Sequence, residues 1–184
     1  MLYAMPQRTA HMLLGRPQPG EYAGYAQADI DLVEGEDILR ILDRQMLETQ
    51  RLFGPVGDKR AATLTYAPGK WTLKQVVGHL SDDERIFAYR ALCLARNDPT
   101  PLPGFEEKDY VRFGGFETRR FEELLDELRI VREATIAFVR GLTQEAWLRR
   151  GIVNGYPASV RGLAFHVAGH ELHHLRIVKE KYLA

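Results

Sequence analysis

The stretch GHELHH, residues 169–174, has residue types and a spacing that could chelate a metal ion. On an α-helix, positions four apart differ by about 40° around the axis, so His170 and His174 lie on one face, one turn apart. Two imidazoles placed in this way can bind a single divalent ion. The apolar residues on the same face are Leu163, Val167, Ile177 and Val178. The histidine pair is therefore expected to point into the core of the protein.

The same stretch contains His-Glu-x-x-His, the signature of zinc peptidases. Those enzymes take their third ligand from farther along the chain, but residues 175–184 lack the glycine and histidine of the longer signature. A third ligand must therefore come from upstream. His79 meets this requirement, because Val76, Phe87 and Leu94 share its face of a predicted helix. Three protein ligands leave one coordination position open for water or substrate, as in catalytic sites.

The elements that must position these histidines are helices. Four segments carry apolar residues at spacings of three and four: 36–53, 72–96, 118–142 and 159–182. Thr72 and Ser159 are expected to cap the second and the fourth helix. No segment shows clear period-two alternation, so we predict an all-α four-helix bundle over residues 36–184, after an N-terminal arm over residues 1–35. The longer connections 97–117 and 143–159 favour crossovers.

The composition argues against several other classes of function. The 25 basic residues equal the 25 acidic ones, which argues against nucleic acid as a partner. No run approaches ~18 apolar residues, so no membrane span is expected. The single cysteine, Cys93, cannot form an internal disulfide, which suits a reducing cytoplasm. The first twenty residues lack the apolar core and cleavage site of a signal peptide.

Two segments in this order, PGKWTLKQVVGHL (68–80) and GHELHHLRIVKEKYL (169–183), resemble the DinB/YfiT-like superfamily of small metal-binding four-helix bundles. The similarity extends from about residue 32 to residue 183 and includes ERIFAYRAL, PLPGF and NGYPASVRGLAFHVAGH. The resemblance implies an up-down-down-up bundle, a divalent ion held by His79, His170 and His174, and a homodimer. Relatives include transferases and isomerases that use thiols such as bacillithiol or mycothiol, and others labelled metal-dependent hydrolases.

Three further residues are candidates for the pocket, although no catalytic residue is assigned. Asp83 lies one turn beyond His79 and could orient a histidine, bind the ion or accept a proton. Arg90 follows two turns later and could orient a substrate or simply pair with Asp83. His173 adjoins the chelating pair and is expected to support the site or to pack rather than to bind the ion.

Other residues that could carry chemistry have simpler interpretations. Glu171 points about 100° away from His170, so we expect a solvated or interface glutamate and not the general base of a peptidase. His166 and Trp71 are expected to pack. Cys93 lies about 21 Å along the helix from the nearest predicted ligand, too far to share its ion.

The leading hypothesis is a divalent-metal-dependent enzyme that activates a low-molecular-weight thiol for S-transfer or isomerisation of a small-molecule substrate. One alternative is a hydrolase that uses metal-bound hydroxide, with Asp83 as the base. Another is a non-catalytic stress or interaction protein whose ion joins two helices. Three histidines suit zinc and nickel, and also iron or copper.

Overall fold

The structure, a computed structural model, describes residues 15–183. The first fourteen residues of the predicted arm, on which the argument against a signal peptide partly depends, lie outside the described residues. Within the described range, no helix has both the length and the apolar character needed to cross a membrane.

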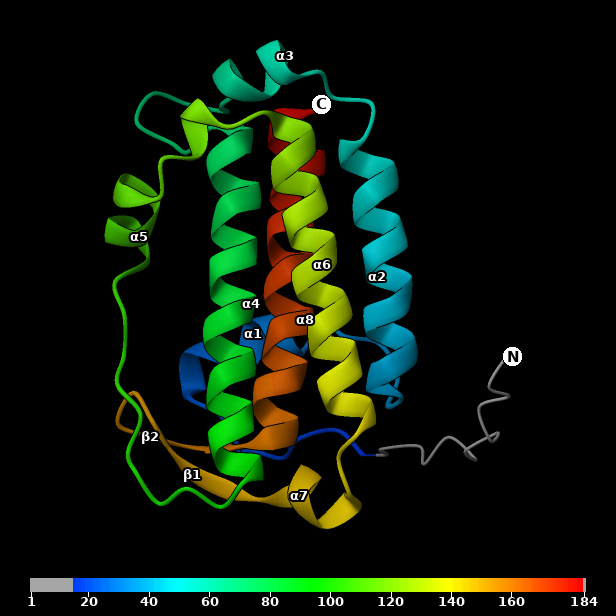
Figure 1. The fold of residues 1–184 in the computed structure, drawn as a ribbon, viewed down its shortest axis with the longest axis vertical. Helices are drawn as coiled ribbons and strands as arrows, with labels where there is room; N and C mark the ends of the chain where they lie inside the picture. The colour runs from blue at the N-terminus through cyan, green and yellow to red at the C-terminus, as the bar shows by residue number, and fades with distance from the viewer. Residues whose placement is uncertain (1–14, 184) are drawn as a thin grey trace, which may run out of the picture.

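Four long helices form the bundle: α2 (Ile38–Phe53), α4 (Leu73–Ala95), α6 (Phe121–Arg140) and α8 (Val160–Ile177). In Figure 1, α2 and α8 run upward and α4 and α6 run downward, which confirms the expected up-down-down-up order. Helix α4 packs against α6 and α8, and α2 packs against the same two helices. A π-helical turn, η3 (Val178–Tyr182), extends α8 to the C-terminal end.

The helices that carry the histidines begin at the predicted residues. The Thr72 hydroxyl accepts a hydrogen bond from the Gln75 amide at 3.3 Å, and the Gln75 side chain accepts one from the Thr72 amide at 2.9 Å. The Ser159 hydroxyl accepts one from the Gly162 amide at 2.9 Å. Such caps satisfy amides that have no partner within the helix, and so fix where α4 and α8 begin.

The connections differ in length and course. Helix α3 (Asp58–Thr63) joins α2 to α4 at the upper end of the bundle in Figure 1. The connection from α4 to α6 contains α5 (Glu107–Phe113) and the short helix η2 (Phe116–Thr118), and it returns along the outside of α4. Helix α7 (Gln144–Leu148) and two strands, β1 (Arg150–Val153) and β2 (Tyr156–Ser159), join α6 to α8. Both longer connections thus contain structure of their own.

The two strands correct the expectation that no strand is present. They pair antiparallel, and Asn154 and Gly155 form the turn with φ of 51° and 79°. Positive φ at both central residues is the geometry of a tight hairpin turn, which asparagine and glycine adopt readily. The connection that follows α4 is fastened to this hairpin, because the Leu102 amide donates to the Ile152 carbonyl at 2.9 Å.

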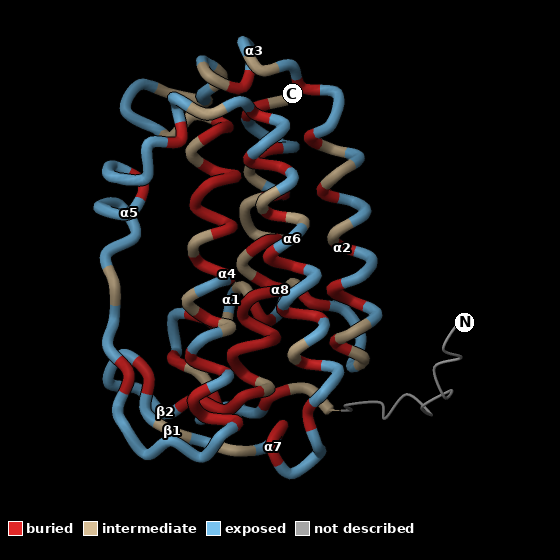
Figure 2. Tube along the Cα trace, viewed as in Figure 1, coloured by how far each residue is buried: buried red, intermediate tan, exposed pale blue. Residues whose placement is uncertain are grey.

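The interior of the bundle is divided into two apolar regions with a polar layer between them. Figure 2 shows buried residues along the inward faces of the long helices. One region includes Trp147 and Phe165 at the hairpin end, and the other includes Phe53 and Phe121 at the opposite end. Residues of the polar layer are Gln45, Thr49, His79, Asp83, Glu84, Arg132, His170 and Glu171. Two of the three predicted metal ligands, His79 and His170, therefore lie in this polar layer, and His174 lies one turn farther along α8.

The described part of the N-terminal arm packs on α8. It contains the short helices η1 (Gly24–Ala26) and α1 (Gln27–Ile30), and α1 lies against α8. The Glu21 carboxylate is buried and accepts hydrogen bonds from the Ser159 hydroxyl and the Arg150 guanidinium, each at 2.8 Å. The arm is thus joined to the beginning of α8 and runs beside the helix that carries two of the histidines.

We expect a Gly169→Ala substitution to destabilise the contact between α1 and α8. A Cβ at Gly169 would lie 2.2 Å from the Asp29 carbonyl oxygen, which belongs to the backbone and cannot turn aside. Overpacking of this kind typically costs about 1–3 kcal/mol of unfolding free energy. Urea unfolding measures this loss. Gly24→Ala is the matched control, because no atom lies within 4 Å of a Cβ at Gly24. Equal midpoints for the two variants would contradict the prediction.

Candidate metal centre

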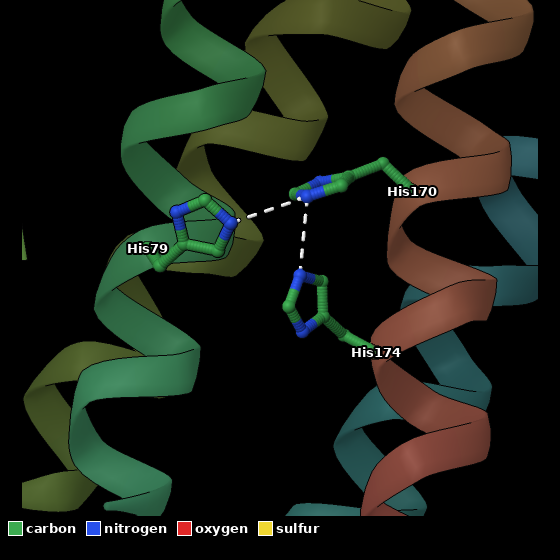
Figure 3. A group of neighbouring side chains, drawn as sticks. All are labelled: His79, His170 and His174. Carbon is green, nitrogen blue, oxygen red and sulfur yellow. Dashed lines mark hydrogen bonds between the residues drawn. The ribbon is translucent and has the colours of Figure 1, made fainter. Parts of the chain in front are cut away.

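Helices α4 and α8 bring the three predicted histidines together (Figure 3). The Nε2 atoms of His79 and His174 each lie 3.1 Å from Nε2 of His170. Among residues 15–183, this is the one group of three or more histidine, cysteine or acidic side chains whose potential ligand atoms all lie within 4.8 Å of one another. The predicted meeting of residues from the middle and the end of the chain is therefore present. We call these three residues the histidine trio.

The spacing of the histidine trio fits a divalent ion. Imidazole nitrogens lie about 2.0–2.1 Å from zinc, so two of them in a tetrahedral site are roughly 3.3 Å apart. The two separations of 3.1 Å that involve His170 are close to that value, and the potential ligand atoms of all three histidines lie within 4.8 Å of one another. An ion between the three nitrogens would need little movement of the helices, and it would keep one position for a further ligand.

The histidines are held in the form that binds metals. Burial lowers the pKa of His79 to about 4. Burial, together with the nearby His79 and His173, lowers the pKa of His174 to about 3. The pKa of His170 is also well below its ordinary value, through burial and then through its histidine neighbours. All three rings are therefore neutral near pH 7, with lone pairs available for an ion.

Asp83 lies behind one of the ligands. Its Oδ2 atom is 3.2 Å from Nδ1 of His170, on the side of the ring away from the other two histidines. The contact lacks hydrogen-bond geometry, and burial raises the pKa of Asp83 to about 8. A cation on the trio would favour the ionised carboxylate. Of the three predicted roles for Asp83, this geometry favours the orientation of a ligand histidine.

Arg90 lies away from the trio. Its guanidinium donates to the Pro103 carbonyl at 2.6 Å and lies 4.9 Å from the centre of the Phe87 ring and 5.4 Å from that of Phe105. Within the described part of the chain it forms no ion pair with Asp83, so the pairing considered from the sequence is absent. Arg90 instead joins the connection that follows α4 to the middle of that helix.

The other two histidines of α8 do not join the trio. Nδ1 of His173 lies 3.3 Å from Asp29 Oδ1, so this residue links α8 to α1. His166 stacks on Phe87 with 4.3 Å between ring centres, and its buried Nδ1 has no hydrogen-bond partner among the described residues. His166 thus packs against an aromatic ring, and a supporting role of His173 at the site stays a prediction.

Glu171 corrects a prediction. It was expected to be solvated or at an interface, yet it is only 3% exposed. Its carboxylate accepts hydrogen bonds from the Thr49 hydroxyl at 2.6 Å and from Arg132 at 2.9 Å, and Arg132 also binds Glu84 at 2.8 Å. The direction 100° from His170 therefore leads to the side chains of Thr49 on α2 and Arg132 on α6. Thr49, Glu84 and Arg132 were not among the residues predicted to lie near the site.

A cavity of about 300 Å³ lies beside His174. Its wall comes from the loop before α4, the first turns of α4, α5, and the end of α8 with η3. Trp71 lies in this wall, and the centre of its ring is 4.8 Å from that of His79. The cavity therefore reaches one member of the trio, His174. Trp71, whose ring also lies next to that of His79, has a position beyond the packing role expected for it.

The metal-free protein is expected to lose stability as the pH falls from about 6.5 to 4. Histidines in the unfolded chain take up protons near pH 6.5, whereas folded His79 and His166 do so near about 4 and His174 near about 3. In this window the unfolded state binds more protons, so acid lowers the free energy of unfolding. Asp83 acts in the opposite direction, because its pKa in the folded state is raised to about 8, and burial also raises the pKa values of Asp29 and Asp82. We expect the histidines to dominate, because His170 is a fourth histidine whose pKa is lowered.

Urea unfolding of chelator-treated protein at several pH values tests this dependence. The midpoint should fall between pH 6.5 and pH 4, and a His79→Gln variant should show a shallower fall because one titrating group is absent. A midpoint that stays level or rises on acidification would contradict the pKa directions above.

Comparisons with known proteins agree with this fold. The model of the DinB superfamily matches residues 41–178. YfiT from Bacillus subtilis, described as a probable metal-dependent hydrolase with an unusual four-helix bundle topology, has a TM-score of 0.71 and 21% identity, covering 90% of this chain and 91% of that one. A mycothiol-dependent maleylpyruvate isomerase has a TM-score of 0.64 and 11% identity, covering 74% of this chain and 57% of that one.

No curated protein matches the sequence. At these identities the two solved structures show the fold alone. The family model matches the sequence itself, from the first turn of α2 to the start of η3, and this range includes all three members of the histidine trio. Three quarters of the sequence thus fits one family, and the chain belongs to the DinB superfamily.

Proposed function

We propose that this protein is a divalent-metal-dependent enzyme that activates a low-molecular-weight thiol for S-transfer or isomerisation. The observation that supports this choice most directly is the composition of the cavity beside His174. Its wall holds aromatic rings and two lysines, and no carboxylate from the described residues contributes to it.

The absence of a carboxylate from that wall matters because a thiol and a water molecule, the two candidate nucleophiles, differ in whether they need a base from the protein. Bound at the trio, a divalent cation would supply Lewis acidity that lowers the pKa of a thiol placed in the open position. A thiol made acidic in this way needs no base from the protein. Attack by water is helped by a carboxylate within one water molecule of the site. Asp83 does not serve this purpose, because it lies behind His170 at Nδ1.

The residues of the chain have separate tasks in this proposal. The histidine trio holds the ion from two helices, and Asp83 keeps the ring of His170 turned toward it. Trp71 covers His79 on the cavity side and excludes water from that ligand. Zinc and nickel are the ions that we propose, because neutral imidazoles suit both.

A metal-dependent hydrolase remains the second candidate. The description of YfiT as a probable metal-dependent hydrolase favours it, together with the coverage of nine tenths of both chains. It requires a base that the cavity wall does not offer, so we place it after the thiol-dependent reaction.

The proposal is tested on untagged protein by elemental analysis and by activity. Metal-loaded and chelator-treated samples are incubated with bacillithiol, mycothiol or glutathione and the electrophile monochlorobimane. A thiol-dependent rate in the loaded sample alone is the expected result. Hydrolysis of p-nitrophenyl acetate by the loaded sample without any thiol would favour the hydrolase. Absence of a bound metal and of any metal-dependent rate would overturn both candidates.

A further inference from the structure

The cavity beside His174 also carries information about the substrate. Lys70 and Lys108 line it, the first from the loop before α4 and the second from α5. A third lysine, Lys181, lies next to the cavity with Nζ 5.2 Å from the centre of the Tyr66 ring, and Lys70 Nζ lies 5.8 Å from the same centre. Three segments distant in sequence thus bring positive charge to one opening.

These lysines differ from the other cations near this end of the bundle. Among residues 15–183, none of the three has a carboxylate within the 4.0 Å that defines an ion pair. Lys74, in the first turn of α4, is paired with Asp58 at 2.7 Å. Arg119 is paired with Glu127, and Arg120 with Glu123. The cavity opening therefore has three lysines that form no ion pair with the described carboxylates, although the whole chain has a formal net charge of zero.

The deeper wall is aromatic. Tyr66 and Tyr182 meet edge to face with 5.1 Å between ring centres, and Trp71 continues the wall toward His174. The Tyr182 hydroxyl donates to the Trp71 carbonyl at 2.8 Å, so its polar group is already satisfied within the protein. A wall of this kind favours a flat apolar body, since ring faces contribute contact area and stacking.

We propose that this cavity binds the electrophilic substrate, and that the substrate is a small anion with a flat unsaturated or aromatic body. The anionic group, a carboxylate or a phosphate ester, meets Lys70 and Lys108, while the body lies along Trp71 and Tyr182 with its reactive end toward His174. The volume of about 300 Å³ is at the lower end of the range for ligand pockets, so the substrate is small. This inference rests on the proposed function, because it names the substrate class of the same site.

Calorimetric titration with three probes of one shape tests the inference. 2-Naphthoate and 2-naphthyl phosphate carry an anion on a flat body, and 2-naphthol is neutral at pH 7. Both anions, or one of them, should bind more tightly than the neutral probe, and the comparison between the two anions identifies the preferred group. Added salt should weaken the binding of the two anions and leave the affinity for 2-naphthol unchanged, because the lysines are exposed to solvent.

Lysine variants locate the binding. Lys70→Gln and Lys108→Gln should each weaken anion binding about twofold to fivefold, the usual contribution of an exposed charge pair, and together they should weaken it further. Lys59→Gln is the matched control, since Lys59 is exposed on α3 and does not line the cavity. Unchanged affinity in the double variant would overturn the inference.

Titrations of metal-loaded and chelator-treated protein separate this inference from the proposed function. Lysine-dependent anion binding in both forms supports the cavity assignment even if no thiol-dependent rate is found. Binding only to the loaded form, with no effect of the lysine variants, would mean that the ion itself takes the anion, and this would overturn the inference. Equal affinity for 2-naphthol and the anions, in a protein that does show thiol-dependent turnover, would overturn it and leave the proposed function standing.

Discussion

Replacing His170 by alanine is expected to release the bound divalent ion and to abolish every metal-dependent activity. His170 is the central member of the trio, because His79 and His174 both approach its Nε2 atom at 3.1 Å. It is also the member whose Nδ1 atom lies 3.2 Å from Asp83 Oδ2, and we propose that Asp83 orients it. Loss of a residue that only supports a ligand typically costs 10–100-fold in metal affinity, so loss of this ligand should cost more. Elemental analysis and competition with a zinc-binding dye measure the change.

Two variants make this result specific. His173→Ala changes the neighbouring histidine, which pairs with Asp29 and stays outside the trio, and it should retain the ion. Asp83→Asn keeps the size of the side chain but loses its charge, so it should weaken metal binding by about 10–100-fold without removing it. If His170→Ala kept one ion per chain with unchanged affinity, the trio would not be the metal site.

The bundle and the trio could be predicted because both follow from spacing along single helices. Apolar residues at spacings of three and four predicted all four long helices, and the capping residues Thr72 and Ser159 predicted where two of these helices begin. The hairpin was missed because its strands have four residues each, too few for an alternating pattern to emerge. The Asn154-Gly155 pair was the available signal, since this dipeptide favours tight hairpin turns.

The polar layer was missed for a different reason. The helical angle places Glu171 relative to its own helix, but it does not say which helices cover that direction. Helix α8 contacts α1, α2 and α4, so it has little free surface for a solvated glutamate. A signal was present on the partner helix, where Arg132 follows Leu128 by four residues and thus lies on an apolar stripe. The cavity gave no such signal, because four separate segments form its wall.

The charges of the polar layer connect the trio to the stability of the bundle. Without an ion, the raised pKa of Asp83 keeps that carboxyl protonated near pH 7, and Glu84 and Glu171 outnumber Arg132 by one charge. A dication would favour the ionised form of Asp83, and its two positive charges would then balance the two excess negative charges. The formal charges of these four side chains and the ion add up to zero, whereas the same side chains without the ion have a net negative charge. The ion should therefore stabilise the folded state by more than its three bonds to histidine.

Replacing Arg132 by methionine is accordingly expected to lower the free energy of unfolding of the metal-free protein by about 3–5 kcal/mol. The guanidinium is 3% exposed and binds both Glu84 and Glu171, so its removal leaves two buried carboxylates without a cation. Addition of zinc should raise the urea midpoint more in this variant than in the unchanged protein, because the ion is then the remaining positive charge of the layer.

Arg129→Met provides the matched control, one turn earlier on α6. Arg129 is partly exposed and pairs with Glu133 at the surface, so this variant should leave the midpoint nearly unchanged. Adding Glu84→Gln and Glu171→Gln to Arg132→Met should restore much of the lost stability, since the cost comes from unbalanced charge and not from lost packing. An Arg132→Met protein as stable as the Arg129→Met protein, with the same response to zinc, would show that charge in this layer does not couple the metal site to the fold.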